Sequence, residues 1–226
     1  MTTLAALLEG VSMKFIPILD ARIPRNAYTP IDLSAQNTEL KTLDITKVEN
    51  CQTYIDSVLA AKSAQVAYGG YLEQRNLYLN NPNFNSENEA LRNVHLGVDF
   101  WAKAGTEVLM PLNGVLHSFC NNSAKGDYGP TLILQHELAG VRFYSLFGHL
   151  SLASLEGLYE GKSFQAGEVL GTLGTPDSNG NYAPHLHFQL ILNLGSYFDN
   201  YPGVCTTKDK EYYSINCPNP LLLLHL

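Results

Sequence analysis

The sequence predicts a mainly β protein, an antiparallel β-sandwich with an N-terminal extended arm and one or two helices. Downstream of residue 90, short runs of β-branched and aromatic residues are interrupted by glycine and proline. Runs of this length and spacing are typical of strands in an antiparallel sandwich. Upstream, Pro17, Pro24 and Pro30 favour an extended arm over the first forty-five residues. The predicted strands are 108–110, 114–119, 131–135, 141–147, 169–173 and 186–192.

One helix is predicted in the N-terminal part. Asn50 is a residue type that caps helix N-termini, and Tyr54, Val58 and Leu59 recur at the spacing of one helix face. We therefore expect a helix over residues 51–63. The predicted division of the chain is 1–90 for an N-terminal arm and helical extension packed on the core, 91–195 for the β domain with the candidate site, and 196–226 for a C-terminal tail.

Composition restricts the class of protein. The chain has 226 residues, of which 45% are hydrophobic and 15% charged, as expected for a packed globular protein. The formal net charge of −7 and the scattered Lys and Arg residues argue against a nucleic-acid partner. Because no apolar run approaches about 18 residues, no membrane span is predicted.

The cysteines and the N-terminus bear on location. The four cysteines show no C-x-x-C spacing, so a thiolate metal site is not predicted. Residues 1–21 lack a basic start, a long apolar core and a clear cleavage site. These features favour a cytoplasmic protein with reduced thiols. If the sequence is a mature form, a periplasmic or extracellular location is the alternative, and Cys205 and Cys217 then lie close enough in sequence to pair.

Two short clusters of histidine suggest a metal site. His95 is followed four residues later by Asp99, and His185 is separated from His187 by one residue. Zinc favours imidazole and carboxylate ligands, and a catalytic site usually keeps three protein ligands and an open position. On a strand, His185 and His187 project from the same face, so either both bind one metal or one stands beside the metal.

The spacing of the first cluster requires a bend. Four residues on a flat strand span about 13 Å, which is too far for two ligands of one ion. Gly97 is the expected hinge between His95 and Asp99, because glycine adopts backbone angles closed to other residues. His149 is predicted to lie exposed at a strand end, a position suited to proton transfer. His117 and His136 lie within predicted strands and are interpreted as structural.

The ordered motifs H-x-x-x-D, G-H-L and P-H-L-H-F resemble those of the lysostaphin/LytM-type zinc metalloendopeptidases, which cleave peptide bonds in bacterial cell walls. The resemblance covers roughly residues 92–192 and implies a duplicated hybrid motif fold that binds one Zn²⁺. By position it implies that His95, Asp99 and His187 are the zinc ligands and that His149 and His185 are the catalytic pair. Where that family often has a tyrosine two residues before the histidine of the G-H-L motif, this chain has Phe147. Supporting motifs are Ala104-Gly-Thr, Pro111-Leu-Asn-Gly-Val, Tyr128-Gly-Pro-Thr, Gly167-Glu-Val-Leu-Gly and Gly174.

A polar and aromatic cluster upstream of the motifs has two interpretations. Tyr68, Tyr71, Glu73 and Arg75 form either a solvated loop with aromatic packing, or a wall of the substrate groove or an arm that covers the zinc. Arg92 is predicted to pair with Asp99 or with a substrate carboxylate.

The function favoured by these residues is a zinc-dependent endopeptidase. Its substrate is expected to be a peptide or peptidoglycan fragment, including glycine-containing peptides, attacked by metal-activated water with two assisting histidines. A histidine phosphocarrier on the same hybrid fold is the first alternative, since such carriers also use paired histidines. A catalytically inactive adaptor is the second.

Overall fold

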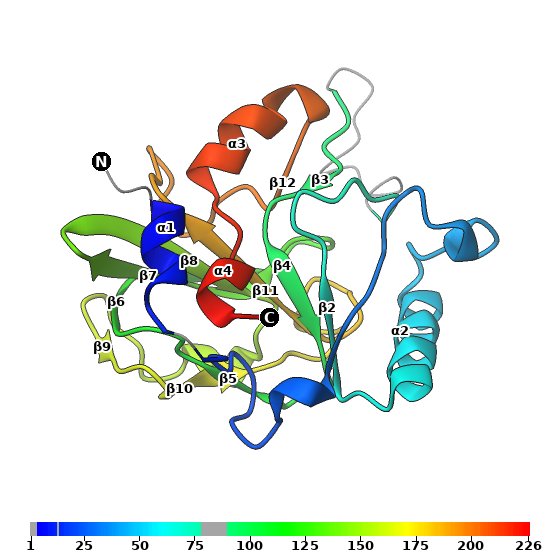
Figure 1. Cartoon of the computed structure of the whole chain (residues 1–226), viewed down its shortest axis with the longest axis horizontal. Helices are drawn as coiled ribbons and strands as arrows, with labels where there is room; N and C mark the ends of the chain where they lie inside the picture. Colours follow the sequence, from blue (N-terminus) through cyan, green and yellow to red (C-terminus); the bar gives the residue numbers. More distant parts are fainter. Residues whose placement is uncertain (1–3, 13, 78–89) are drawn as a thin grey trace.

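The computed structural model describes residues 4–12, 14–77 and 90–226, which are dominated by one large sheet (Figure 1). Within these residues the sheet has eight strands in the order β1-β2-β4-β11-β8-β7-β6-β9. All neighbours pair antiparallel except β1 and β2 at one edge, which are parallel. The strands are β1 (Tyr28–Pro30), β2 (Val66–Gly69), β4 (Val98–Trp101), β6 (Gly114–Asn122), β7 (Gly129–Leu138), β8 (Val141–Gly148), β9 (Ser163–Phe164) and β11 (His185–Ile191).

Two further strand pairs, four short 3-10 helices and four α-helices accompany the sheet in the described residues. β5 (Glu107–Leu109) pairs with β10 (Val169–Thr172), and β3 (Val94–His95) pairs with β12 (Val204–Cys205). The 3-10 helices are 25–27, 38–40, 152–155 and 207–209. Each of the six predicted strands corresponds to an observed strand, and the prediction of a mainly β, largely antiparallel fold with few helices is confirmed.

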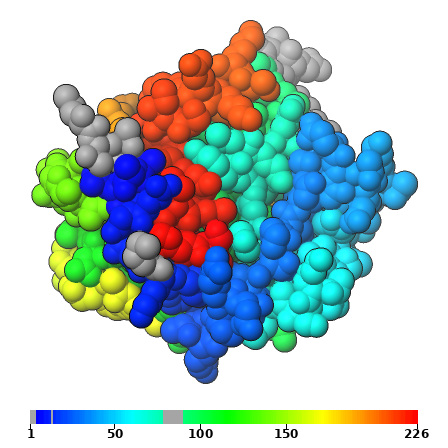
Figure 2. All heavy atoms as spheres, in the orientation of Figure 1, coloured from blue at the N-terminus to red at the C-terminus, as the bar shows by residue number. Residues whose placement is uncertain are grey.

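The main hydrophobic core lies on one side of the sheet. Phe100, Phe147 and Phe188 point into it from the three central strands β4, β8 and β11. They pack together with residues of β5, β10, α1 (Leu4–Glu9) and α4 (Leu221–Leu224). Figure 2 shows α1 and the C-terminal segment side by side on the outer surface of this layer. The opposite side of the central strands carries buried polar residues and a smaller hydrophobic cluster with residues of β7, β8 and β11.

The predicted helix exists but begins earlier than expected. α2 spans Val48–Lys62 with Lys47 as its N-cap residue, and it ends at Ser63, which adopts a left-handed backbone conformation. The prediction that Asn50 is the N-cap residue was wrong. Asn50 lies in the first turn, and its Nδ2 donates to the carbonyl oxygen of Asp44 at 2.9 Å. The helix still buries one face, with Cys51 buried against the sheet.

The last thirty residues, for which the sequence predicted no regular element, contain β12, α3 (Lys210–Asn216) and α4. β12 pairs with the strand that carries His95, with Val204 opposite His95. The four cysteines are all free in the structure. Among the helices in the described ranges, none combines the length and the apolar character needed to cross a bilayer. The division at residues 90 and 195 stays a prediction.

His136 on β7 gives the fold a pH dependence. It is buried, its Nδ1 donates to the carbonyl oxygen of Asn113 at 2.8 Å, and its Nε2 accepts from Ser145 Oγ at 2.6 Å. Burial lowers its pKa to about 4, whereas an unfolded histidine titrates near 6.5. The neutral ring thus stabilises the fold above pH 6.5, and this contribution is lost as the pH falls from 6.5 towards 4.

We expect this residue to account for up to about 3 kcal/mol of the acid destabilisation. In urea unfolding series between pH 7 and pH 4, a His136→Gln variant should lose stability less steeply than the wild type. Parallel curves for the two proteins would show that His136 does not carry this dependence.

Candidate metal centre

The two central strands place the candidate ligands through their alternation. On β11, Leu186, Phe188 and Leu190 face the hydrophobic core, so His185, His187 and Gln189 share the opposite face. On β4 the core side chains are Val98 and Phe100, which leaves Asp99 on the same side as the histidines. His187 and Asp99 are directly opposite each other in the antiparallel pair. Cross-strand neighbours of this kind bring their side chains together.

His95 reaches the same point because the chain bends between β3 and β4. The bend lies at Leu96 and Gly97, where a hinge was predicted. The reason for glycine is space rather than an unusual backbone angle. A Cβ at Gly97 would lie 2.7 Å from the carbonyl oxygen of Phe188 and 2.8 Å from the His187 ring.

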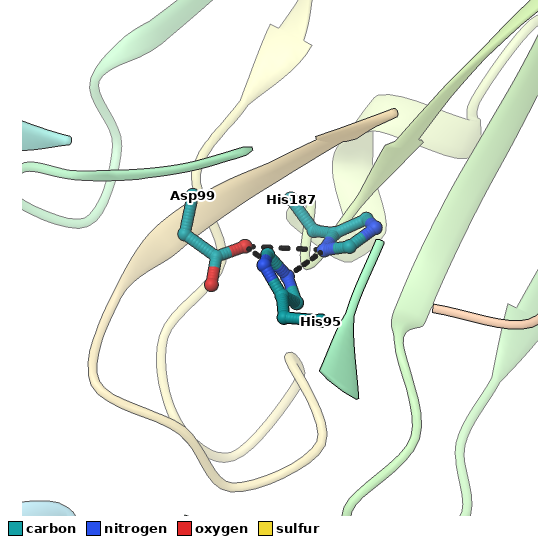
Figure 3. A group of neighbouring side chains, drawn as sticks. All are labelled: His95, Asp99 and His187. Carbon is teal, nitrogen blue, oxygen red and sulfur yellow. Dashed lines mark hydrogen bonds and ion pairs between the residues drawn. The ribbon is translucent and has the colours of Figure 1, made fainter. Parts of the chain in front are cut away.

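The structure brings His95, Asp99 and His187 into one buried group (Figure 3). The three facing atoms are His95 Nε2, Asp99 Oδ1 and His187 Nδ1, separated by 2.9, 3.1 and 3.2 Å. Two atoms bound to one tetrahedral zinc ion at about 2.0–2.1 Å lie about 3.3 Å apart. The group therefore has the spacing of a small-cation site, and three protein ligands leave one position open.

Hydrogen bonds on the far side of each ring fix which nitrogen carries the proton. The carbonyl oxygen of Gly70 accepts from His95 Nδ1 at 2.9 Å, so Nε2 presents a lone pair. Gln189 Nε2 donates to the carbonyl oxygen of Pro202, so Gln189 Oε1 accepts from His187 Nε2 at 2.9 Å, and Nδ1 presents a lone pair. Two lone pairs and a carboxylate oxygen facing one another fit a bound cation.

The charges of the site agree with this arrangement. Burial lowers the pKa of His95 to about 4, which keeps the ring neutral at pH 7. Burial opposes ionisation of Asp99, yet the neighbouring His95 and Arg75 hold its pKa well below the usual range. A neutral imidazole and an ionised carboxylate are the forms that bind a metal.

His149 and His185 stand next to this group. Their ring centroids are 4.2 Å apart, and His185 Nε2 lies 3.8 Å from Asp99 Oδ1. His149 Nδ1 donates to the carbonyl oxygen of Asn179 and His185 Nδ1 to that of Ala183. Both Nε2 atoms are therefore unprotonated in the neutral rings. Burial lowers the pKa of both residues, that of His149 well below its usual value.

The exposed position predicted for His149 was wrong. The residue is buried and has a φ of 65°, a left-handed conformation that turns the ring inward at the end of β8. Its backbone N–H donates to the carbonyl oxygen of Tyr128, whose ring lies against both His149 and His187. A pattern of residue types did not reveal this packing, because Tyr128 comes from a loop before β7.

A cavity of about 350 Å³ opens beside the five residues. All five residues predicted for the site line it. Its other walls include aromatic residues from separate parts of the chain, among them Trp101, Tyr182 and Tyr201. Because Trp101 stacks on the His185 ring at 5.7 Å, the cavity wall also holds that ring in place.

Two upstream predictions need correction. The basic partner of Asp99 is Arg75, whose Nη1 lies 2.5 Å from Asp99 Oδ2, and not Arg92, whose Nη2 donates to the carbonyl oxygen of Val204. Arg92 lines the cavity, and its pairing with a substrate carboxylate stays a prediction. The interpretation of Arg75 as part of a solvated loop was also wrong, because its side chain is 0% exposed. The described residues that line the cavity do not include Arg75, Tyr68, Tyr71 or Glu73. These four residues therefore form no wall of the cavity. Gln189 was missed, although the two-residue period from His185 and His187 predicts its face.

The sheet thus presents a His–Asp–His group that could hold one metal ion, with two more histidines beside it and a cavity in front. Residues 93–199 match the sequence model of Peptidase family M23. This match covers a little under half of the chain, and it confirms the resemblance to lysostaphin/LytM-type peptidases that the motifs predict. The sequence matches no curated protein.

Several solved structures are similar to part of this chain at low sequence identity. The catalytic domain of the antimicrobial peptidase lysostaphin from Staphylococcus simulans is 24% identical, with a TM-score of 0.43, over 68% of this chain and 100% of that domain. The catalytic domain of the prophage-encoded M23 protein EnpA from Enterococcus faecalis is 19% identical, with a TM-score of 0.38, over 53% and 84%. A peptidase M23 structure from Pseudomonas aeruginosa is 20% identical, with a TM-score of 0.37, and the match covers 57% of this chain and 42% of that one.

Proposed function

We propose that this chain is a zinc-dependent endopeptidase that hydrolyses peptide bonds in peptidoglycan-like or glycine-containing peptides. The observation that carries the proposal is the convergence of His95 Nε2, Asp99 Oδ1 and His187 Nδ1 with their lone pairs facing one another. These three residues would hold one zinc ion. When bound, the ion supplies a Lewis acid for the attacking water and for the scissile carbonyl.

His149 and His185 supply the proton transfers that amide hydrolysis requires. One proton must leave the attacking water, and one must reach the departing amine. The Nε2 atoms of both residues are unprotonated in the neutral rings, and Asn179 and Ala183 hold the rings through Nδ1. Both side chains are buried at the cavity wall, and His185 lies beside the Asp99 carboxylate.

The alternatives make different demands on the same residues. A histidine phosphocarrier needs a histidine nitrogen exposed to a phosphoryl donor and has no use for a carboxylate among its histidines. Here Asp99 Oδ1 lies within 3.2 Å of two imidazole nitrogens, an arrangement that favours a cation over a phosphoryl group. An inactive adaptor would retain the metal but not the hydrolysis.

The test combines metal analysis with a cleavage assay. We expect one zinc per chain by mass spectrometry of the metal content, and release of new amino termini from peptidoglycan fragments or glycine-bridged peptides. A chelator such as 1,10-phenanthroline should stop cleavage, and added Zn²⁺ should restore it. One zinc per chain without cleavage of any fragment would support the adaptor, and phosphoryl transfer without zinc would support the carrier.

A further inference from the structure

The ligand group receives support from a segment that lies outside the family match. Residues 70–75, here called the outer clamp, follow β2 at the edge of β4 (Figure 1). The clamp is bound along its length to the strand of the first ligand. Leu72 N donates to His95 O, His95 N to Glu73 O, and Arg75 N to Asn93 O, each at 2.9 Å.

The outer clamp contacts two of the three ligands. The carbonyl oxygen of Gly70 accepts from His95 Nδ1, which turns His95 Nε2 towards the ligand group. Gly70 has a φ of +100°, and a Cβ there would overlap the Arg75 guanidinium and lie 3.0 Å from His95 Nδ1. The position therefore requires glycine for both its backbone angle and its close approach.

The second contact divides the two oxygens of the Asp99 carboxylate between different partners. Oδ1 faces His95 Nε2 and His187 Nδ1 at 3.2 and 3.1 Å, whereas Oδ2 binds Arg75 Nη1 at 2.5 Å. Arg75 thus holds the oxygen that points away from the ligand group.

Arg75 is itself fixed on further sides. Its Nε lies 2.5 Å from Glu73 Oε2, and its guanidinium lies over the Trp101 ring at 5.5 Å from the ring centroid. The side chain is fully buried. A planar guanidinium held in this way offers donors in fixed directions, which a lysine ammonium does not.

We propose that Arg75 is a positioning residue of the metal centre, and that the outer clamp sets the orientation of His95 and Asp99 before the metal binds. This inference rests on the proposed zinc site. Partners that orient metal ligands typically contribute about 10- to 100-fold to metal affinity or activity. The ligand site thus extends upstream of the 93–199 family match.

The test is the zinc affinity of Arg75 variants in the full chain, measured by competition with a chromophoric chelator. We expect Arg75→Met to weaken zinc binding about 10- to 100-fold and Arg75→Lys to fall between Met and wild type. The visible spectrum of the Co²⁺-substituted protein should change in both variants, since the carboxylate orientation changes. Arg22→Met is the matched control, because Arg22 is exposed and pairs with Asp20.

Folding must be separated from positioning. Arg75→Met leaves the carboxylates of Glu73 and Asp99 without their buried cation, so the charge-balanced Arg75→Met/Glu73→Gln variant is measured beside it, with thermal unfolding as the check. If neither Met variant folds, Arg75→Lys decides through its zinc affinity and Co²⁺ spectrum.

Each remaining outcome separates the two proposals. Unchanged zinc affinity and an unchanged Co²⁺ spectrum in the folded Arg75 variants would overturn the positioning role and leave the zinc site standing. Tighter zinc binding and faster cleavage in Arg75→Met would overturn it in favour of an inhibitory ion pair. A wild-type protein that binds no zinc would overturn the proposed function together with this inference.

Discussion

A His187→Ala variant is expected to lose its bound zinc and all measurable peptide hydrolysis. His187 contributes the nitrogen that lies closest to both other ligands, 2.9 Å from His95 Nε2 and 3.1 Å from Asp99 Oδ1. Zinc sites with four protein ligands bind with about 10–16 kcal/mol, or about 3 kcal/mol per ligand, which corresponds to a loss of 100-fold or more in affinity. Two remaining ligands also fail to fix the ion for catalysis. We expect kcat/KM to fall by at least about 10⁴-fold.

His117→Ala is the matched control for this variant. His117 lies on β6, where its ring packs against Tyr144 and Phe198. The control should keep one zinc per chain and normal cleavage. Full zinc content in a folded His187→Ala protein would remove His187 from the ligand set. Circular dichroism of both variants separates this result from a loss of structure.

Much of the site follows from the sequence because it depends on strand periodicity. The period of two on β11 puts His185 and His187 on one face, and it makes Leu186 a core residue. The bend at Gly97 follows from the distance that His95 and Asp99 must cover. The family motifs then assign the five residues, and the structure brings all five to one cavity.

The parts that the sequence does not predict depend on contacts between distant segments. Arg75 reaches Asp99 through the pairing of β2 with β4, which no local pattern near Arg75 reveals. His149 is buried because Tyr128 covers it from another loop. The helix α3 contributes no candidate site residue and buries only Asn216, so its periodicity gives little signal.

The second large effect is expected from the two histidines outside the ligand group. His149→Ala and His185→Ala should each keep one zinc per chain and lower kcat by about 10²- to 10⁴-fold, the usual contribution of general acid–base catalysis. The physical reason is geometric. The facing atoms of the ligand group lie within 3.2 Å of one another. His185 Nε2 is farther away, at 3.8 Å from Asp99 Oδ1, so we expect zinc binding not to depend on it. The two rings touch, so they share one proton-transfer region.

The measured zinc content distinguishes a role of His149 and His185 in proton transfer from a role in metal binding. The KM distinguishes proton transfer from substrate binding. A variant that keeps zinc, keeps KM and loses kcat has lost an interaction made only in the transition state. The double variant His149→Ala/His185→Ala should fall little below the weaker single variant if the pair acts as one unit. Tyr182→Phe is the control for packing, because the Tyr182 ring contacts both histidines and its hydroxyl bonds to Gly126 instead. Loss of zinc in either single variant would place that histidine among the ligands, and an unchanged kcat would exclude it from proton transfer.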